Sequence, residues 1–196
     1  MLKKLKKLNK FCTALVLCLL AADIFAWDKI DPAILAHADK GVNAIYNLDL
    51  KTARTELYNL LAEQLSALAE DENFFLPVLS NAAALLYDNI EDLNWAGFYL
   101  MDKGSLMLGP FQGKVACVRI PLGKGVCGTA ARDDRTVLVA NVHEFEGHIA
   151  CDGASNSEIV IPMHCSGKVI GVLDIDSPSF DRFKFEDQVG LEKFVR

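Results

Sequence analysis

The chain has 196 residues, of which 52% are hydrophobic and 23% charged, so it can bury a substantial core and is not disordered. Its formal net charge of −6 argues against a nucleic-acid partner, because surfaces that bind nucleic acids are normally basic. This length predicts one globular domain with an additional segment at one end.

Residues 1–26 have the layout of a secretory signal peptide. Five lysines in MLKKLKKLNK precede the apolar run FCTALVLCLLAADIFA, which ends at an alanine suited to cleavage and is short for a transmembrane helix. Asp23 and Ile24 fit this pattern poorly. We interpret residues 1–26 as a signal-like or anchor segment and residues 27–51 as a linker. The alternative is an over-long start, in which residues 1–51 are not part of the working protein.

The globular domain is expected to span residues 52–196 and to begin with two helices. Leucines at helical spacing predict a helix over residues 52–70, and a second helix is expected over residues 74–88. Residues 94–101 are strand-like, and a turn then leads into the segment SLMLGPF. Residues 114–120 (KVACVRI) alternate between two faces, as residues of a strand do.

A glycine-rich segment follows over residues 121–134, with glycines on both sides of Cys127 and then a short helix. A strand over residues 135–140 precedes a loop over residues 141–156. A loop of about 16 residues with little structure of its own is usually a binding loop or a lid. This loop is therefore a candidate part of a functional site.

Two further strands, SEIVIPMHC and KVIGVLDID, are joined by Ser166 and Gly167, and a final amphipathic helix begins near Lys184. Helices, then strands with hairpin-like connections, then a helix predict an α+β fold. In this fold an antiparallel sheet is covered by helices, in contrast to a parallel doubly wound sheet.

Three acids fall at the ends of the last two expected strands. In KVIGVLDID, Asp174 and Asp176 share a face with Val172, while Leu173 lies on the other face. Glu158 opens the preceding strand and can approach the two aspartates across the hairpin. Asp174 and Asp176 either form a binding site together with Glu158 or are merely a solvated strand end.

The six cysteines show no C-x-x-C pair, which excludes a zinc ribbon and a thioredoxin motif. Cys12 and Cys18 lie in the apolar N-terminal run and are interpreted as small hydrophobic residues. Cys117, Cys127 and Cys165 are each compatible with simple core packing.

Cys151 lies in the long loop, next to Asp152 and close to His148. The spacing between His143, His148, Cys151 and His164 matches no structural zinc pattern. We therefore expect no metal site. An accessible cysteine in a glycine-rich loop beside a histidine is suited to hold a thiolate. Together with a carboxylate cluster that can bind an ammonium group, this favours thiol redox chemistry on a small amino compound.

Five segments resemble the free methionine-(R)-sulfoxide reductases, which are built on a GAF domain: NWAGFYL, LGPFQGKVACVRIPLGKGVCGTAA, NVHEFEGHIACD, SEIVIPM and GVLDIDSPSFDRF. The resemblance covers about residues 52–196. It implies a single GAF domain with a six-stranded antiparallel sheet flanked by helices, usually in a homodimer, and a cytoplasmic location. Export or membrane contact is expected only if residues 1–26 act as a signal or an anchor.

The resemblance also implies roles for the three cysteines in its motifs. Cys151 corresponds to the attacking cysteine, Cys117 to the main resolving cysteine and Cys127 to a secondary one. The implied mechanism forms a sulfenic acid on Cys151, which Cys117 converts to a disulfide that thioredoxin reduces. It requires no metal and no organic cofactor.

The resemblance places the substrate among the acids and two aromatic residues. Glu158, Asp174 and Asp176 correspond to acids that hold the substrate and assist protonation of its oxygen, and Trp95 and Tyr99 to aromatic residues around its methylthio end. Two alternatives remain open: a GAF module that binds a small ligand as a sensor, and a redox-sensing thiol protein without turnover.

Overall fold

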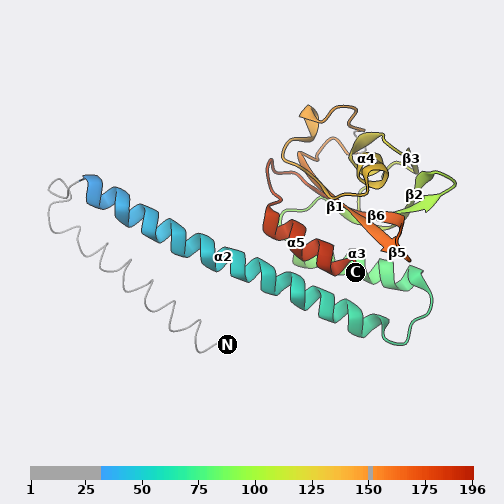
Figure 1. Cartoon of the computed structure of the whole chain (residues 1–196), viewed down its shortest axis with the longest axis horizontal. Coiled ribbons are helices and arrows are strands. Elements are labelled where there is room, and N and C mark those ends of the chain that lie inside the picture. Colours follow the sequence, from blue (N-terminus) through green and yellow to red (C-terminus); the bar gives the residue numbers. More distant parts are fainter. Residues whose placement is uncertain (1–31, 150–151) are drawn as a thin grey trace. The chain divides into compact units, whose positions relative to one another are not determined.

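The computed structural model describes residues 32–149 and 152–196, with side chains from residue 51 onward. The chain divides into two compact units, Met1–Asp49 and Leu50–Arg196, and the second unit contains the whole sheet (Figure 1). The expected signal-like or anchor segment over residues 1–26 lies outside the described residues. None of the helices among those residues combines the length and the apolar character needed to cross a membrane.

The first described helix, α2 (Pro32–Ala69), begins 20 residues before the predicted start at residue 52. Residues 32–51, which we assigned to a linker, are therefore helical. Pro32 occupies the first helical position, where proline is well tolerated because its missing N–H would have no partner. The boundary between the two compact units falls within this helix, between Asp49 and Leu50. The linker role of residues 27–51 stays a prediction.

Six strands form one sheet in the order β3-β2-β1-β6-β5-β4, and every neighbouring pair is antiparallel. The strands are β1 (Trp95–Asp102), β2 (Ser105–Gly113), β3 (Arg119–Pro121), β4 (Val137–Val139), β5 (Ser157–Cys165) and β6 (Lys168–Ser177). The predicted antiparallel α+β architecture is confirmed. The strands β5 and β6 pair over the longest stretch in the sheet and form the hairpin that carries the three acids.

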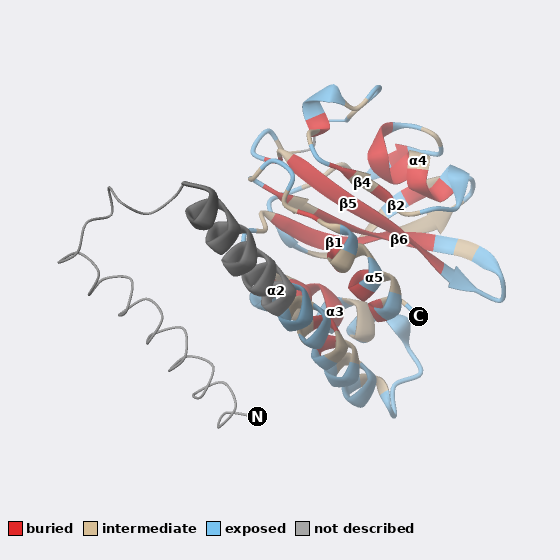
Figure 2. Ribbon diagram, turned by 60° about the vertical axis from the view of Figure 1, so that its left-hand side comes forward, coloured by how far each residue is buried: buried red, intermediate tan, exposed pale blue. Residues whose placement is uncertain are grey.

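Helices cover both faces of the sheet in the unit Leu50–Arg196. The helices α3 (Phe75–Asn89) and α5 (Phe185–Phe194) lie on one face and α4 (Gly125–Asp133) lies on the other (Figures 1 and 2). The first face packs one apolar cluster that includes Leu61 of α2, and the second face packs another that includes Cys127 of α4. The acids of β6 belong to the face covered by α4.

An ionic cluster in the interior joins α2 to α5. The carboxylate of Asp187, which is 1% exposed, accepts hydrogen bonds from the Tyr58 hydroxyl at 2.7 Å and the Arg54 guanidinium at 2.8 Å. The backbone N–H of Lys184 donates to the same carboxylate at 2.7 Å. Because a buried charge is stable only when it is paired and hydrogen-bonded, these contacts fix the position of α5 on α2.

Two segments differ from the sequence prediction. The expected strand over residues 114–120 is only Arg119–Pro121, because β2 ends at Gly113 in a left-handed conformation with φ of 124° that breaks the extended chain. Cys117 therefore lies in a connecting segment rather than in a strand. Cys127 lies within α4, whereas the sequence indicated a loop before the helix.

Candidate active site

The three predicted acids come together on the α4 face of the sheet. In the β5–β6 register Glu158 pairs with Asp176 and Val160 with Asp174, so that all three acids point to the same side. Glu158 and Asp174 are each 6% exposed. The interpretation of Asp174 as part of a solvated strand end is therefore wrong, and Asp176 is half-buried.

Burial is the main cause of unusual proton affinity in this acid cluster, which we define as Glu158, Asp174 and Asp176. Desolvation, and then the charge of Asp174, raise the pKa values of Glu158 and Asp176 well above the ordinary range. Desolvation also raises the pKa of Asp174 to about 6. Three carboxylates cannot all ionise side by side in a dry site, so the cluster keeps protons at neutral pH.

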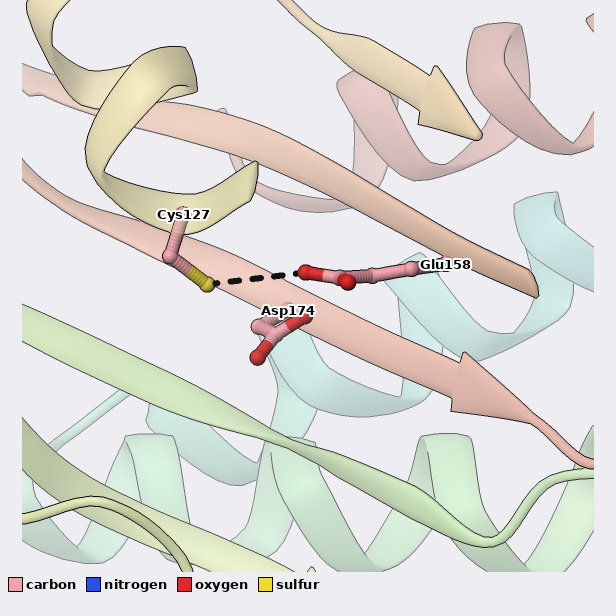
Figure 3. A group of neighbouring side chains, drawn as sticks. All are labelled: Cys127, Glu158 and Asp174. Carbon is pink, nitrogen blue, oxygen red and sulfur yellow. Dashed lines mark hydrogen bonds between the residues drawn. The ribbon is translucent and has the colours of Figure 1, made fainter. Parts of the chain in front are cut away.

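Cys127 faces the acid cluster from α4, on the opposite wall of the site. Its Sγ lies 3.9 Å from Oε1 of Glu158, and the thiol donates to this oxygen (Figure 3). Ligand atoms of Cys127, Glu158 and Asp174 all lie within 4.8 Å of one another. Among the described residues, this group is the one that could hold a metal ion, and the absence of a metal site stays a prediction.

Two aromatic residues of β1 form a further wall. The rings of Trp95 and Tyr99 stack with their centroids 5.9 Å apart, and Trp95 also stacks on Phe111 at 5.3 Å. Gly97 makes this arrangement feasible, because a Cβ at that position would collide with Phe111 and with the Trp95 ring. The rings thus line the site on the side of β1 and β2.

Both aromatic residues also hold the segment that carries Cys117. The indole Nε1 of Trp95 donates to the backbone oxygen of Lys114 at 3.1 Å, and the Tyr99 hydroxyl donates to the backbone oxygen of Cys117 at 3.0 Å. Desolvation, and then the charge of Asp174, raise the pKa of Tyr99, so its hydroxyl stays a donor. The aromatic wall therefore fixes the approach of Cys117 to the site.

A cavity opens between these walls and the long loop. It is lined by the acid cluster, the aromatic pair and Cys127, and in addition by Val115, Ala116, Ile120, Gly125, Val126, His148, Ile149, Asp152 and Ser155. Partial burial, and then the charge of His143, lower the pKa of His148, which keeps this imidazole neutral at neutral pH. The cavity combines an apolar wall with a proton-rich carboxyl wall, an arrangement typical of a small-molecule site.

The cysteines of the described residues fall into two classes. Cys117 is disulfide-bonded, whereas Cys127 and Cys165 are free thiols, so neither of these two is the partner of Cys117. Cys165 is exposed at the end of β5, away from the cavity lining. Cys151 lies outside the described residues, and its role as the attacking cysteine stays a prediction.

A polar network next to Cys151 was missed by the sequence analysis. Asp152 accepts hydrogen bonds from Nδ2 of Asn94 at 3.1 Å, from the backbone N–H of Ala154 at 3.0 Å and from Nζ of Lys114 at 3.3 Å. Asn94 also donates to the Ser155 hydroxyl at 2.9 Å. These bonds tie the loop after Cys151 to the start of β1. Nothing in the spacing of these residues indicates the network, because it joins segments 58 residues apart.

Two other histidines, His143 and His164, do not join the acid cluster. The ring of His143 is hydrogen-bonded to Oδ1 of Asn156 at 2.9 Å, and the ring of His164 to Oδ1 of Asp134 at 2.6 Å. Neither residue lines the cavity. Among the described residues, the site therefore offers carboxyl and thiol groups together with the single imidazole of His148.

Comparison with known proteins places this geometry in a family. The GAF domain family matches residues 79–194. The free methionine-R-sulfoxide reductase of Escherichia coli is 54% identical over 142 residues, which cover 72% of this chain and 86% of that protein. The chain belongs to the free methionine-R-sulfoxide reductase family of GAF-domain proteins.

Two solved structures agree with this assignment to the free methionine-R-sulfoxide reductases. The Staphylococcus aureus protein fRMsr in complex with substrate is 55% identical, with a TM-score of 0.67 over 70% of this chain and 90% of that chain. The Neisseria meningitidis free methionine-R-sulfoxide reductase in complex with its substrate is 40% identical, with a TM-score of 0.69 over 72% and 85%. The predicted family and the predicted GAF fold are both confirmed, and as a family member the chain is an oxidoreductase.

Proposed function

We propose that this protein reduces free L-methionine-(R)-sulfoxide to L-methionine through a sulfenic acid on Cys151 and an intramolecular disulfide. The observation that carries the proposal is the buried acid cluster, in which Glu158 and Asp176 keep protons at neutral pH and which opens into the same cavity as the aromatic wall. Reduction of a sulfoxide needs a proton for the departing oxygen and an apolar surface for the methylthio group. The relatives named above are reductases of this compound.

The first half-reaction transfers the sulfoxide oxygen to Cys151. The thiolate attacks the sulfoxide sulfur while a protonated acid of the cluster donates its proton to the oxygen. Methionine leaves after a two-electron reduction, and Cys151 is oxidised to a sulfenic acid. General acid catalysis of this kind typically contributes about 10²–10⁴ in rate.

The second half-reaction restores Cys151. The thiol of Cys117 attacks the sulfenic acid, water leaves and a disulfide forms, which the dithiol of thioredoxin then reduces by exchange. Support comes from the disulfide-bonded state of Cys117, whose segment is held at the cavity by Trp95 and Tyr99. No metal ion and no organic cofactor takes part in either step.

The free amino group of the substrate is the expected ligand of the acid cluster. Oδ1 of Asp174 is buried without a hydrogen-bond partner among the described residues, so a donor from the substrate would satisfy it. An ammonium group supplies such a donor and also offsets the negative charge of the cluster. Methionine sulfoxide within a peptide lacks this group, and the enzyme should therefore reject it. The rings of Trp95 and Tyr99 would contact the methylthio end.

Its partners and location follow from the same proposal. We expect a homodimer that receives electrons from thioredoxin in the cytoplasm. If residues 1–26 direct export or tether the chain to a membrane, the enzyme would need another source of reducing equivalents, because disulfides persist outside the cytoplasm. N-terminal sequencing of the mature protein distinguishes these two cases.

A coupled assay tests the proposed function. The protein is incubated with thioredoxin, thioredoxin reductase, NADPH and free methionine sulfoxide, with Cys151→Ser as the control. We expect one NADPH oxidised per methionine formed from the R epimer, and almost no turnover of the S epimer or of an N-acetylated substrate. Binding without NADPH oxidation would support a sensor instead. Equal rates on both epimers would contradict recognition by the acid cluster.

A further inference from the structure

The burial of Cys127 is unfavourable for a cysteine that takes part in disulfide exchange. It lies in α4 with 4% of its surface exposed, packed among apolar residues of the sheet face. Disulfide exchange requires that a thiolate reach another sulfur atom. Desolvation, and then the charges of Asp174 and Glu158, raise the pKa of Cys127 well above its ordinary value. Its thiol is therefore neutral at neutral pH, and the free sulfur is in a poor state to act as a nucleophile.

Cys127 contacts both Asp174 and Glu158 of the acid cluster, and the hydrogen bond to Glu158 has a defined geometry. Its Sγ lies 3.9 Å from Oε1 of Glu158, within the range of a hydrogen bond from sulfur (Figure 3). A neutral thiol is a weak donor, whereas a carboxyl oxygen is an acceptor in either protonation state. Because Glu158 is itself 6% exposed, a donor from the protein offsets part of the cost of its burial.

We propose that Cys127 is a positioning residue, whose thiol donates a hydrogen bond to Glu158 and orients this acid for the substrate, and that it takes no part in disulfide exchange. The inference deepens the proposed function and rests on it. It replaces the secondary resolving role that the family resemblance implies for Cys127. The electrons of the reaction then pass through Cys151 and Cys117 alone.

Several titratable groups surround Glu158, whereas β4, which pairs with it through Val139, contributes none. Asp176 lies opposite in the register of β6, and Asp174 lies two pairs further along the hairpin, on the same face. Tyr99 of β1 and the loop residues His148 and Asp152 line the same cavity. Among these groups, the thiol of Cys127 is the one that lowers the pKa of Glu158, whereas the two aspartates raise it.

Loss of the thiol should therefore make Glu158 a weaker acid. A donor to a carboxylate stabilises its charged form, so its removal raises the pKa of Glu158. The basic limb of the pH profile for single-turnover methionine release should move to higher pH by the same amount. A serine at this position restores a donor, whereas valine or alanine does not.

The test compares Cys127→Ser, Cys127→Val and Cys127→Ala with the matched control Cys165→Ser, which removes an exposed free thiol far from the cavity. Single-turnover methionine release is measured as a function of pH, and recycling by thioredoxin is measured separately. We expect the valine and alanine variants to shift the basic limb to higher pH. Cys127→Ser should keep the wild-type limb, and all variants should form the Cys117 disulfide and be recycled.

A second measurement does not depend on turnover. The side-chain carboxyl of Glu158 is followed by ¹³C NMR in the resting protein, with its signal assigned from Glu158→Gln. Its titration midpoint should move upward in Cys127→Val and Cys127→Ala and remain in place in Cys127→Ser. If wild-type protein reduces no sulfoxide, the proposed function fails while this titration still tests the hydrogen bond.

Two results would overturn the inference. An unchanged Glu158 midpoint in both the valine and the alanine variants would show that the thiol only fills space. A Cys127→Ser variant that releases one methionine per site and is then not recycled by thioredoxin would show that Cys127 is a resolving cysteine.

Discussion

The hydroxyl of Tyr99 donates a 3.0 Å hydrogen bond to the backbone oxygen of Cys117, although the two residues lie on different segments 18 positions apart. This bond links the wall of the substrate cavity to the segment of the proposed resolving cysteine. In the proposed mechanism, the side chain that would contact the substrate thus also holds the group that would close the catalytic cycle. We therefore expect the two half-reactions to be coupled through Tyr99.

Tyr99→Phe should slow disulfide formation more than methionine release. The variant keeps the ring but removes a hydrogen bond of about 1 kcal/mol, which corresponds to about a fivefold slower closure. Rapid quenching with alkylation of remaining thiols measures the two steps separately. Tyr87→Phe, on the other face of the sheet, is the matched control. Slower methionine release with unchanged disulfide formation would show that Tyr99 acts on the substrate alone.

Asn94→Ala should lower kcat/KM by about tenfold, because it frees the loop after Cys151 from the start of β1. The variant removes the donors to Asp152 and Ser155. Lys114→Met removes the ion pair with Asp152, in which the lysine is 70% exposed, and should change kcat/KM by no more than about twofold. If the lysine variant were the more damaging of the two, charge and not loop placement would govern the site.

The acid cluster should reduce stability at neutral pH. Because desolvation raises the pKa of Asp174 from its ordinary value to about 6, the folded protein binds this proton more tightly than the unfolded chain does. Stability conferred by this proton is present below the ordinary pKa, 3.8, and is lost as pH rises through about 6. Asp174→Asn buries no charge, so its Tm should exceed that of wild type by a few degrees at about pH 8 and approach it at about pH 4.

The same Asp174→Asn variant should lose more than about tenfold in kcat/KM, because the amide cannot donate a proton or bind an ammonium group as an anion. Asp88→Asn, at an exposed position of α3, is the control and should change neither quantity. Identical Tm values for Asp174→Asn and wild type at every pH would contradict the proposed burial cost.

Replacement of Asp187 by asparagine should destabilise the fold strongly. Asp187, which is 1% exposed, pairs with the partly buried Arg54 and Arg182 and accepts a hydrogen bond from the Tyr58 hydroxyl, so the change removes the buried counter-charge of both arginines. A loss of about 3–5 kcal/mol is typical for such a change. Denaturant unfolding measures it, with Asp181→Asn as the control, because Asp181 pairs with Lys184 at the surface. A loss below about 1 kcal/mol would mean that the cluster is dispensable.

The sequence predicted the β5–β6 hairpin and its acids well, because alternation with period 2 fixes which residues share a face. Asp174 and Asp176 could be placed beside Glu158 from this alternation and the short turn alone. Their burial could not be predicted from the sequence, since it depends on α4 and on the long loop, which fold over the acids. The sequence left open whether the acids are solvated, and only the three-dimensional packing resolves this point.

Other errors have the same physical origin. Residues 114–118 alternate as a strand does, but the left-handed Gly113 ends β2 before them. The carbonyls of Lys114 and Cys117 accept hydrogen bonds from the Trp95 and Tyr99 side chains. The early start of α2 at Pro32 was missed because no amphipathic stripe marks its first turns. Side chains from distant segments determine where a strand such as β2 ends, and the local sequence pattern does not indicate these contacts.

The most direct test of the proposed mechanism is a single turnover without thioredoxin. Free L-methionine-(R)-sulfoxide is mixed with the reduced wild-type protein, Cys117→Ser and Cys151→Ser, and the methionine released per site is counted. We expect about one methionine per site from Cys117→Ser, with a sulfenic acid trapped on Cys151 by dimedone, and none from Cys151→Ser. A methionine burst from Cys151→Ser would contradict the proposal, because another group would then attack the sulfoxide.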